Sequence, residues 1–399
     1  MENLTRNHHL DFIRGIAVLG ILMMNIQAFS MPLTAYGNPT SYGEFSDTNV
    51  LAYLFTHLLF DLKFMSIFST LFGVGIAIFC ERVSQREGSA GRRHYRRMGW
   101  LLLFGLIHAY FIWWGDILTA YALAGCLSYL MLKSTQKTLL ITAAGLLAFY
   151  SAFMLLQGLV IPILPEEEVA KSILPMWQPT AEALAEELNA YQGTWYESFV
   201  FRVEQTLTLQ PYLIFYLPRI IALNLIGIVL YRSGFFTFEW RKSTYLLWAM
   251  GGIVCGSLLT AFGIQQNFAH NFHWSFSMAH GMQFNYWGSL FTAMGYLALF
   301  MLISQTSSGL VSRGLQSVGR MAFTNYILQS LLATTLFYGF GFGYFGQVER
   351  PELIMITLGI WLVIVIFSVI WLRTFTQGPL ELLWRKLTYG VSSKPMNIT

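Results

Sequence analysis

Apolar runs of about twenty residues recur along the whole chain. A helix of that length crosses the roughly 30 Å hydrocarbon core of a bilayer, because each residue adds about 1.5 Å. Only helices satisfy every backbone group of such runs in lipid. The chain is therefore predicted to be an all-α polytopic membrane helix bundle, a single integral membrane domain over residues 1–399 with about ten transmembrane helices and the lipid bilayer as its main partner. The predicted spans are residues 11–29, 55–80, 98–114, 117–132, 138–161, 211–231, 243–263, 284–303, 320–340 and 352–373.

Composition excludes the soluble classes. Of the 399 residues, 55% are hydrophobic and 11% are charged, against roughly 25% charged residues in soluble domains. Cys80, Cys126 and Cys255 all lie in apolar runs, and three cysteines make no disulfide framework. We interpret them as small buried hydrophobic residues. Further apolar residues from Val50 precede the second span, so this span is expected to be long, tilted or broken near Asp61 and Lys63.

Lysine and arginine gather on one side of the predicted bundle. If the odd-numbered spans rise from the cytoplasm, the inner loops and tails hold 18 of the 24 basic residues. The outer loops hold only Lys171, Arg202 and Arg350. By the positive-inside rule, this split predicts cytoplasmic N and C termini. The net charge of +4 is then an anchoring pattern, and no nucleic-acid partner is expected. The arginine-rich loop 82–97 also suits a phosphate-rich cytosolic ligand or anionic lipid.

Two extramembrane elements are predicted. The outer (periplasmic) segment 163–210 carries Leu184, Leu188, Tyr191 and Trp195 at spacings of four, three and four beside many carboxylates. This pattern favours an amphipathic surface helix, with a solvated linker as the alternative. Segment 378–390 begins with Gly and Pro and mixes apolar with charged residues, which predicts an inner interfacial helix.

Charged residues inside spans mark candidate functional positions, because each costs roughly 2.5 to 3.5 kcal/mol in a lipid-facing position. Arg14 and Asn25 are eleven residues apart and project from nearly the same side of the first helix. A structural pairing of Arg14 with Asp11 is the alternative. Lys63 and Arg219 are the other basic residues within spans, and Lys63 can alternatively extend toward the interface.

Polar groups near the predicted midplane complete the candidate set. His108 lies about 16 Å along the helix from Arg97 and can be a general base, a proton relay or a satisfied core histidine. Asn325 and Gln329 share a helix face at i, i+4. Asp116 is a candidate catalytic residue beside His108, with capping of the fourth span as the alternative, and Tyr121, one turn deeper, is a candidate binding residue. Helix packing decides whether these groups converge.

A glycine pattern and a group of histidines do not indicate binding sites, because their surroundings in the sequence do not fit. Gly341, Gly343 and Gly346 spell a dinucleotide-like pattern, but no strand or βαβ unit surrounds them. His270 and His273 share an outer loop with His280, without Cys or nearby carboxylates. No metal site is therefore predicted.

Six sequence blocks together resemble one known family. They are LDFIRGIAVLGILMMN, KFMSIFSTLFGVG, GLIHA, WWGDILTAYAL, VGRMAFTNYILQS and GPLELLWRKLTYG. This set is similar to the YeiB-like bacterial inner-membrane proteins, a domain-of-unknown-function family, over nearly the whole chain. The resemblance implies a multi-pass protein of the bacterial inner (plasma) membrane.

A wider resemblance concerns the first span. Arg14 and Gly15, followed by a polar residue eleven positions after Arg14, are similar to the opening span of transmembrane acyltransferases. Those enzymes pass acyl groups from cytosolic acyl-CoA to acceptors at or across the membrane. Many have His where this chain has Asn25, and the heparan-glucosaminide acetyltransferase group has Asn there with a catalytic His shortly afterwards. This chain has no His between Asn25 and His57, so His108 becomes the candidate base.

Three functions follow as hypotheses. In an acyltransferase with acyl-CoA as co-substrate, the arginine-rich loop, Arg14 and Arg320 would hold the phosphates. His108 would deprotonate the hydroxyl or amine of a small-molecule or lipid-linked acceptor, while Asn325 or Gln329 stabilises the oxyanion. The alternative is a transporter or lipid-handling permease with a polar midplane pathway. The third is a non-catalytic membrane protein, and an oligomer is compatible with all three.

Overall fold

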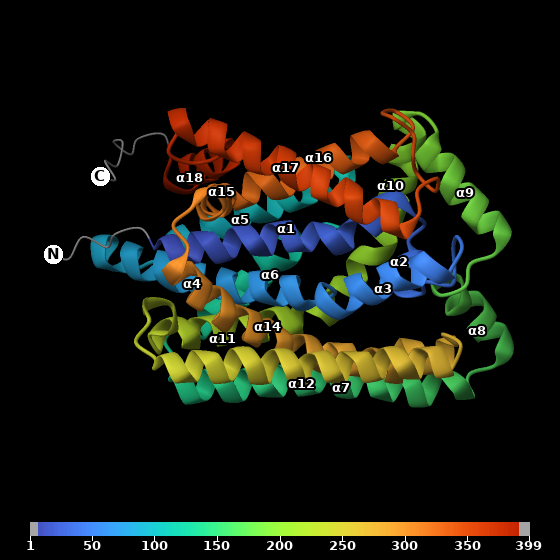
Figure 1. Cartoon of the computed structure of the whole chain (residues 1–399), viewed down its shortest axis with the longest axis horizontal. Coiled ribbons are helices and arrows are strands. Elements are labelled where there is room, and N and C mark those ends of the chain that lie inside the picture. Colours follow the sequence, from blue (N-terminus) through green and yellow to red (C-terminus); the bar gives the residue numbers. More distant parts are fainter. Residues whose placement is uncertain (1–6, 391–399) are drawn as a thin grey trace.

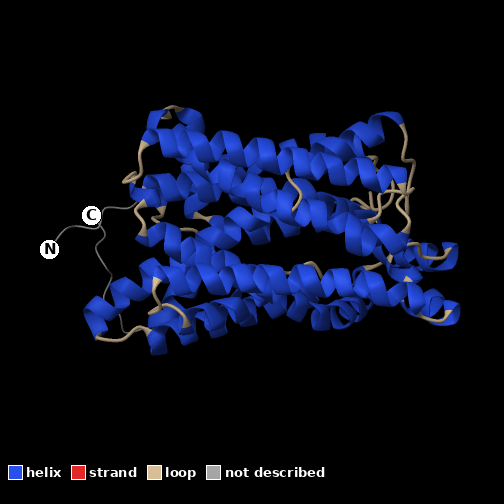
Figure 2. Ribbon diagram, turned by 90° about the horizontal axis from the view of Figure 1, so that it is seen from below, coloured by secondary structure: helices blue, strands red, loops and turns tan. Residues whose placement is uncertain are grey.

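The computed structural model of this chain describes residues 7–390. The two tails, which include Arg6 and Lys394 and which the sequence analysis assigns to the cytoplasm, lie outside the described residues. The described part consists of helices and loops (Figure 2). Its α-helices are α1 His8–Ser30, α2 Thr34–Gly37, α3 Asp47–Leu59, α4 Lys63–Glu87, α5 Gly91–Ile107, α6 Leu118–Leu130, α7 Gln136–Val160, α8 Glu166–Ser172, α9 Ala181–Gln192, α10 Trp195–Leu209, α11 Leu213–Arg232, α12 Lys242–Ala269, α13 Trp274–Phe276, α14 Met282–Thr306, α15 Leu310–Arg320, α16 Ala322–Phe337, α17 Arg350–Thr374 and α18 Pro379–Tyr389.

The long helices run side by side along one axis (Figure 1). We call the end where α1 begins and α18 lies the α18 end, and the opposite end, which carries α8 and α9, the α9 end. Seven stretches of the described chain are long and apolar enough to cross a bilayer: His8–Ser30, Asp47–Glu87, Gln136–Val160, Trp195–Arg232, Lys242–Ala269, Trp274–Thr306 and Arg350–Thr374. Three other predicted spans fall on shorter helices, α5, α6 and α16, of 17, 13 and 16 residues. The all-helical, multi-pass architecture is thus confirmed.

Helix α1 lies at the centre of the bundle (Figure 1) and touches the backbone of α15. A Cβ added at Gly15 would lie 2.0 Å from the carbonyl oxygen of Leu315. One added at Gly319 would lie 1.8 Å from the carbonyl oxygen of Asp11. Glycines permit this close approach, as is common between helices packed in lipid. Gly15 of the Arg14-Gly15 pair is therefore a packing residue.

The predicted interruption of the second span is confirmed. Helix α3 ends at Leu59 and α4 begins at Lys63, with Leu62 in the left-handed conformation at a φ of 60°. Breaking the helix releases backbone carbonyls that need partners inside the membrane. The ammonium of Lys63 donates to the carbonyl of His57 at 2.8 Å and fills one of these positions.

Helices α5 and α6 form a hairpin, as predicted, whose tip is the segment 108–117. The last turn of α5 widens into the π-helical turn η1, His108–Ile112. Such a turn leaves carbonyls without their usual partners. Two side chains of α10 bind them: Thr206 Oγ1 donates to the Ala109 carbonyl at 3.2 Å, and Arg202 Nε donates to the Tyr110 carbonyl at 3.1 Å. Helix α10 therefore holds the hairpin tip in place.

The segment predicted to lie outside the membrane contains α8, α9 and α10 at the α9 end (Figure 1). Helix α9 buries Tyr191 against Tyr338 and Phe345, with ring centroids 4.5 and 4.7 Å apart. Gly193 and Thr194 end this helix, so Trp195 begins α10 instead of continuing the α9 face. The predicted C-terminal helix is present as α18.

Candidate functional site

His108 stands at the start of the π-helical turn and is 1% exposed. Its Nδ1 lies 2.9 Å from Oδ1 of Asp116, and its Nε2 lies 2.8 Å from Oγ of Ser330. These three side chains, which we call the triad, come from the hairpin tip and from α16. His108 and Asp116 were candidate catalytic residues of the sequence analysis, and the fold brings them into contact.

Asp116 is fixed by the helix that follows it. Its Oδ2 accepts a hydrogen bond from the backbone N–H of Thr119 at 2.8 Å, which is the predicted capping role. Gly105 of α5 lies directly behind this cap, since an added Cβ there would lie 2.5 Å from Thr119 N and 2.9 Å from Asp116 Oδ2. The carboxylate is therefore held between one helix end and one glycine, with Oδ1 left for His108.

Ser330 was missed by the sequence analysis. It lies one turn after Tyr326 on α16 and is 1% exposed. A serine inside an apolar helix usually donates only to a carbonyl of the preceding turn, and here the Tyr326 carbonyl lies at the outer limit, 3.4 Å. The bond to His108 is shorter by more than half an ångström. The available signal in the sequence was a polar pair, Gln329 and Ser330, in the middle of a predicted span.

The partners of His108 dictate its tautomer. A carboxylate only accepts, so the Nδ1 proton of a neutral imidazole points at Asp116, and Nε2 accepts from the Ser330 hydroxyl. A histidine oriented in this way is a base toward a hydroxyl. The arrangement is therefore chemically competent for nucleophilic or general-base catalysis.

Aromatic rings enclose the triad. The ring centroid of Tyr326 lies 5.1 Å from that of His108, and that of Trp113 lies 6.3 Å from it. Phe29 stacks on Trp113 at 3.9 Å. Within the described chain the buried indole N–H of Trp113 has no hydrogen-bond acceptor. It is thus a free donor beside the triad, of the kind that stabilises an oxyanion.

A cavity of about 220 Å³ opens between α1, α4, α5, α6, α16 and α18. Arg14, Arg97, Arg320 and Glu381 line its α18 end, with apolar and aromatic side chains beyond them. Tyr121 and Tyr326 also line it, and Tyr326 is the residue that packs against His108. The cavity thus extends from three guanidinium groups to the aromatic wall of the triad.

The arginine and tyrosine side chains that line this cavity have partners within the bundle. Arg14 pairs with Asp11 at 3.2 Å, as the structural alternative proposed, while still lining the cavity. Arg97 lies over the ring of Trp384 at 4.3 Å, and Arg320 donates to the Thr376 carbonyl at 2.8 Å. Tyr121 shares a hydrogen bond with Ser69 at 2.9 Å.

Glu381 of α18 caps the start of α16. Its Oε1 accepts from the backbone N–H groups of Phe323 and Thr324 at 2.8 and 3.1 Å. Burial raises the pKa of the Glu381 carboxyl above its usual range, in spite of these donors. One carboxylate therefore links α18 to the helix that carries Ser330.

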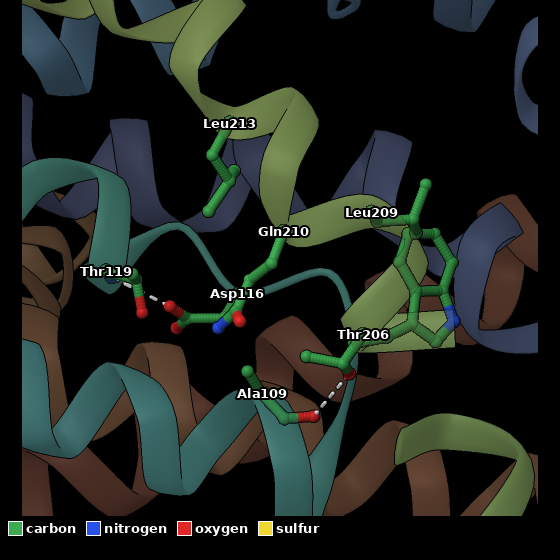
Figure 3. A pocket seen from close by; sticks show the side chains of 8 residues that line it. Ala109, Asp116, Thr119, Thr206, Leu209, Gln210 and Leu213 are labelled. Carbon is green, nitrogen blue, oxygen red and sulfur yellow. Dashed lines mark hydrogen bonds between the residues drawn. The ribbon is translucent and has the colours of Figure 1, made fainter. Parts of the chain in front are cut away.

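A second, small pocket of about 30 Å³ lies beside the hairpin tip (Figure 3). Asp116, Thr119 and Gln210 supply its polar lining, and Thr206 reaches across to Ala109 (Figure 3). The hydroxyl of Thr119 has no hydrogen-bond partner among residues 7–390. The triad carboxylate therefore borders this pocket, while Tyr326 borders the large cavity.

Lys63 lies in a different place, the break cluster, which we define as Asp61, Lys63, Arg219 and Asn285. Lys63 is fully buried and donates to Asn285 Oδ1 at 2.6 Å. Asn285 in turn donates to Asp61 Oδ2 at 2.7 Å. His57 lies 3.1 Å from the same carboxylate oxygen. The amide of Asn285 thus bridges an ammonium and a carboxylate at the helix break.

Arg219 brings α11 into the break cluster. It donates to the hydroxyls of Ser66 and Ser289 at 3.0 and 2.8 Å and to the carbonyl of Tyr286 at 3.0 Å. In the described chain, no hydrogen bond links Lys63 or Arg219 to His108. Within the described residues, the break cluster and the triad are therefore two separate hydrogen-bonded groups.

Two of the three amide candidates bond to other helices. Gln329 donates to the Val18 carbonyl of α1 at 3.1 Å. Asn325 donates to Ser368 Oγ of α17 at 2.9 Å and to the Val318 carbonyl at 3.1 Å. Asn25 is half-buried on α1. None of these side chains bonds to His108 within the described residues, although Gln329 is the sequence neighbour of Ser330.

Comparisons with known proteins agree along nearly the full length. The uncharacterized protein YeiB of Escherichia coli (strain K12) is 33% identical, with 99% of each chain covered. The uncharacterized protein YxaH of Bacillus subtilis (strain 168) is 31% identical, with 95% of this chain and 93% of the relative covered. Residues 230–391 match the family described as a protein of unknown function, DUF418. No solved structure matches the chain.

Proposed function

The chain belongs to the YeiB-like family, and we propose that it is a transmembrane acyltransferase that moves an acyl group from acyl-CoA to a hydroxyl or amine at the membrane. One observation carries the proposal: Tyr326 lines the arginine-rimmed cavity and also packs 5.1 Å from the ring of a buried His108. A ligand in this cavity has only one side chain between it and an activated histidine.

The lining of the cavity suits a donor with an anionic head and a long uncharged arm. Arg14, Arg97 and Arg320 supply guanidinium groups, which bind phosphate oxygens with paired, charge-assisted hydrogen bonds. The apolar lining toward Tyr326 suits a pantetheine arm and a thioester. Acyl-CoA has this distribution of charge, and no metal is needed to bind it.

His108 supplies the base. Asp116 keeps the imidazole in the tautomer whose Nε2 is free to accept a proton, and stabilises the imidazolium that then forms. The indole N–H of Trp113 is the donor best suited to the oxyanion, because Asn325 and Gln329 bond to α17 and α1.

The acceptor would approach from the opposite side. The small pocket beside Asp116 lies under α10, which belongs to the predicted outer segment. Its polar lining suits a hydroxyl or amine of a small-molecule or lipid-linked acceptor. Donor and acceptor would then meet at the triad from the two sides of the membrane.

This mechanism fits a chain with ten membrane passes, cytoplasmic termini and a place in the bacterial inner membrane. The α5–α6 hairpin and α16 would supply the three passes beyond the seven long apolar stretches. The strong bias of Lys and Arg toward the α18 end supports cytoplasmic termini. The arginine-lined cavity would then open toward cytosolic acyl-CoA.

Purified protein in nanodiscs tests the proposal. We expect transfer from radiolabelled acetyl-CoA or palmitoyl-CoA to an acceptor drawn from sugars, amino sugars or lipid-linked glycans. In His108→Ala the rate should fall by about a hundredfold to ten-thousandfold, the usual range for a general base. Absence of CoA binding and transfer, together with solute uptake by proteoliposomes, would contradict the proposal.

A transporter or lipid-handling permease is the second candidate, and the break between α3 and α4 is the observation that favours it. Transporter sites commonly lie at broken helices near the membrane midplane. Here α3 and α4 break beside Asp61, Lys63 and Arg219. Each of the four residues of that cluster has a hydrogen-bond partner, and these bonds join α4, α11 and α14. This satisfaction favours a packing role for the cluster over a solute path.

A further inference from the structure

Both ring nitrogens of His108 already have side-chain partners. Nδ1 faces Asp116 at 2.9 Å and Nε2 faces the hydroxyl of Ser330 at 2.8 Å. All three side chains are buried, and His108 and Ser330 are each 1% exposed. An incoming acceptor would have to displace Ser330 before His108 could take its proton. The hydroxyl that His108 is placed to deprotonate first is therefore that of Ser330.

We propose that Ser330 is the nucleophile of a two-step reaction and carries the acyl group as an ester. The inference rests on the proposed acyl transfer and specifies its covalent course. It assigns Ser330 as a catalytic residue, His108 as the base that activates it and Asp116 as a positioning residue.

The first step forms the Ser330 ester and releases the CoA thiol. His108 Nε2 takes the hydroxyl proton of Ser330 while Oγ bonds to the thioester carbonyl carbon. The carbon–sulfur bond then breaks, and the leaving sulfur takes the proton from Nε2 as free CoA thiol. Asp116 remains ionised and faces the imidazolium that exists between the two transfers.

The second step transfers the acyl group from Ser330 to the acceptor. The acceptor hydroxyl or amine gives its proton to Nε2 while its oxygen or nitrogen bonds to the ester carbonyl carbon. The carbon–Oγ bond breaks, and Ser330 recovers its proton from Nε2. No oxidant, metal or further co-reactant is required.

Three features of the surroundings favour a covalent intermediate. Ser330 and Tyr326 are one turn apart on α16, so the nucleophile lies next to the residue that borders the donor cavity. The unpartnered indole N–H of Trp113 lies beside His108 and can bind the oxyanion of both steps. Burial of the triad excludes water from the ester between donor departure and acceptor arrival.

Acceptor-free incubation tests this course. Full-length protein in nanodiscs receives radiolabelled acetyl-CoA or palmitoyl-CoA, and thiol release and protein-bound label are followed together. We expect a burst of up to one thiol per protein, with the label on the peptide that contains Ser330, removable by hydroxylamine. Ser330→Ala should lose the burst, the label and transfer to acceptor.

Thr334→Val is the matched control. Thr334 lies one turn further along α16, and its hydroxyl donates to the Ser330 carbonyl at 2.8 Å without touching His108. The Thr334→Val variant should show the same burst of thiol release and the same protein-bound label as the wild type. If Ser330→Ala fails to fold, the thiol burst and the labelled peptide of the wild type still test the proposal.

The outcomes separate the two proposals. Acceptor-dependent transfer by the wild type without label on Ser330, or with label on His108 or a cysteine, overturns the acyl-serine course and leaves the acyltransferase proposal standing. Transfer by folded Ser330→Ala at the wild-type rate has the same consequence. The absence of any transfer or label with either donor overturns both.

Discussion

His108 and Asp116 are eight residues apart in the chain, yet their side chains meet at 2.9 Å because the α5–α6 hairpin reverses direction between them. In one continuous helix, residues eight apart are separated by about 12 Å along the axis, so their side chains would not meet. The contact depends on the π-helical turn and on the extended backbone of Trp113. The hairpin tip, with α10 bonded to its free carbonyls, is thus the element that assembles the proposed catalytic centre.

Asp116→Asn should leave the fold intact and remove most activity. An asparagine oxygen can still cap Thr119, but its amide donates toward Nδ1 and so favours the wrong imidazole tautomer. We expect kcat for thiol release to fall by about a thousandfold or more, with KM for acyl-CoA little changed. A variant that keeps the wild-type kcat would show that the pair has only a packing role.

Gly105→Ala should displace the carboxylate of Asp116, because Gly105 packs against it. Its methyl group would lie 2.5 Å from the backbone N of Thr119, where little movement is available. We expect a stability loss of about 1–3 kcal/mol and at least about a tenfold slower transfer. Gly99→Ala on the same helix is the control, because an added methyl group there meets nothing within 4 Å. Equal transfer rates in the two variants would contradict the account of the hairpin tip.

Arg97→Gln should weaken donor binding without changing the chemical step. Its guanidinium lines the large cavity, and loss of a charge-assisted hydrogen bond costs about 1.5–3 kcal/mol. Titration with acyl-CoA should therefore show a Kd roughly ten to a hundred times higher. Arg96→Gln, which alters an exposed neighbour, is the control. If Arg96→Gln weakens binding as much, the phosphate group is held outside the cavity.

Glu187 should make the stability of the α9 end depend on pH. Burial raises the pKa of its carboxyl from 4.5 to about 7, against donors from Leu33 and Gln205. Because the folded state holds this proton more tightly than the unfolded state, stability is highest below pH 4.5 and falls as the pH rises to about 7. The loss amounts to about 3 kcal/mol at most.

Glu187→Gln should flatten this dependence, because glutamine keeps an acceptor oxygen and does not ionise. Unfolding midpoints measured in detergent at acid and alkaline pH should then differ less in the variant than in the wild type. An unchanged difference would mean that Glu187 ionises freely in the folded protein.

Asn285→Ala tests whether the break cluster is structural. The substitution removes the bridge between Lys63 and Asp61 and leaves two buried charges without their shared amide. We expect a loss of about 3–5 kcal/mol in stability, while folded protein retains acyl transfer. Ile303→Ala, on a half-exposed position of the same helix, should cost much less. Stable protein with unchanged transfer but altered solute uptake would instead favour the transporter alternative.

Sequence reasoning located the parts of the site that follow from charge and depth. His108 stands out as an imidazole deep in an apolar run, and the break of the second span is predicted near two charges in a long apolar run. Family membership also followed from the sequence blocks, which the full-length relatives confirm.

The remaining features depend on which helix faces meet. Asn325 and Gln329 were grouped with His108 by depth, but α16 turns them toward α17 and α1 and turns Ser330 toward the triad. The short helices α5 and α6 also depend on packing, because α10 supplies the side chains that satisfy the hairpin tip. Periodicity in one helix does not determine such contacts.

The position of a bound donor distinguishes acyl transfer at the triad from the alternative functions. A cryo-EM map of the protein with a thioether analogue of palmitoyl-CoA should place the phosphates at Arg14, Arg97 and Arg320. The same map should place the sulfur past Tyr326, next to His108 and Ser330. Density for the analogue elsewhere would contradict this mechanism. So would a map that shows no analogue although it was added at saturating concentration.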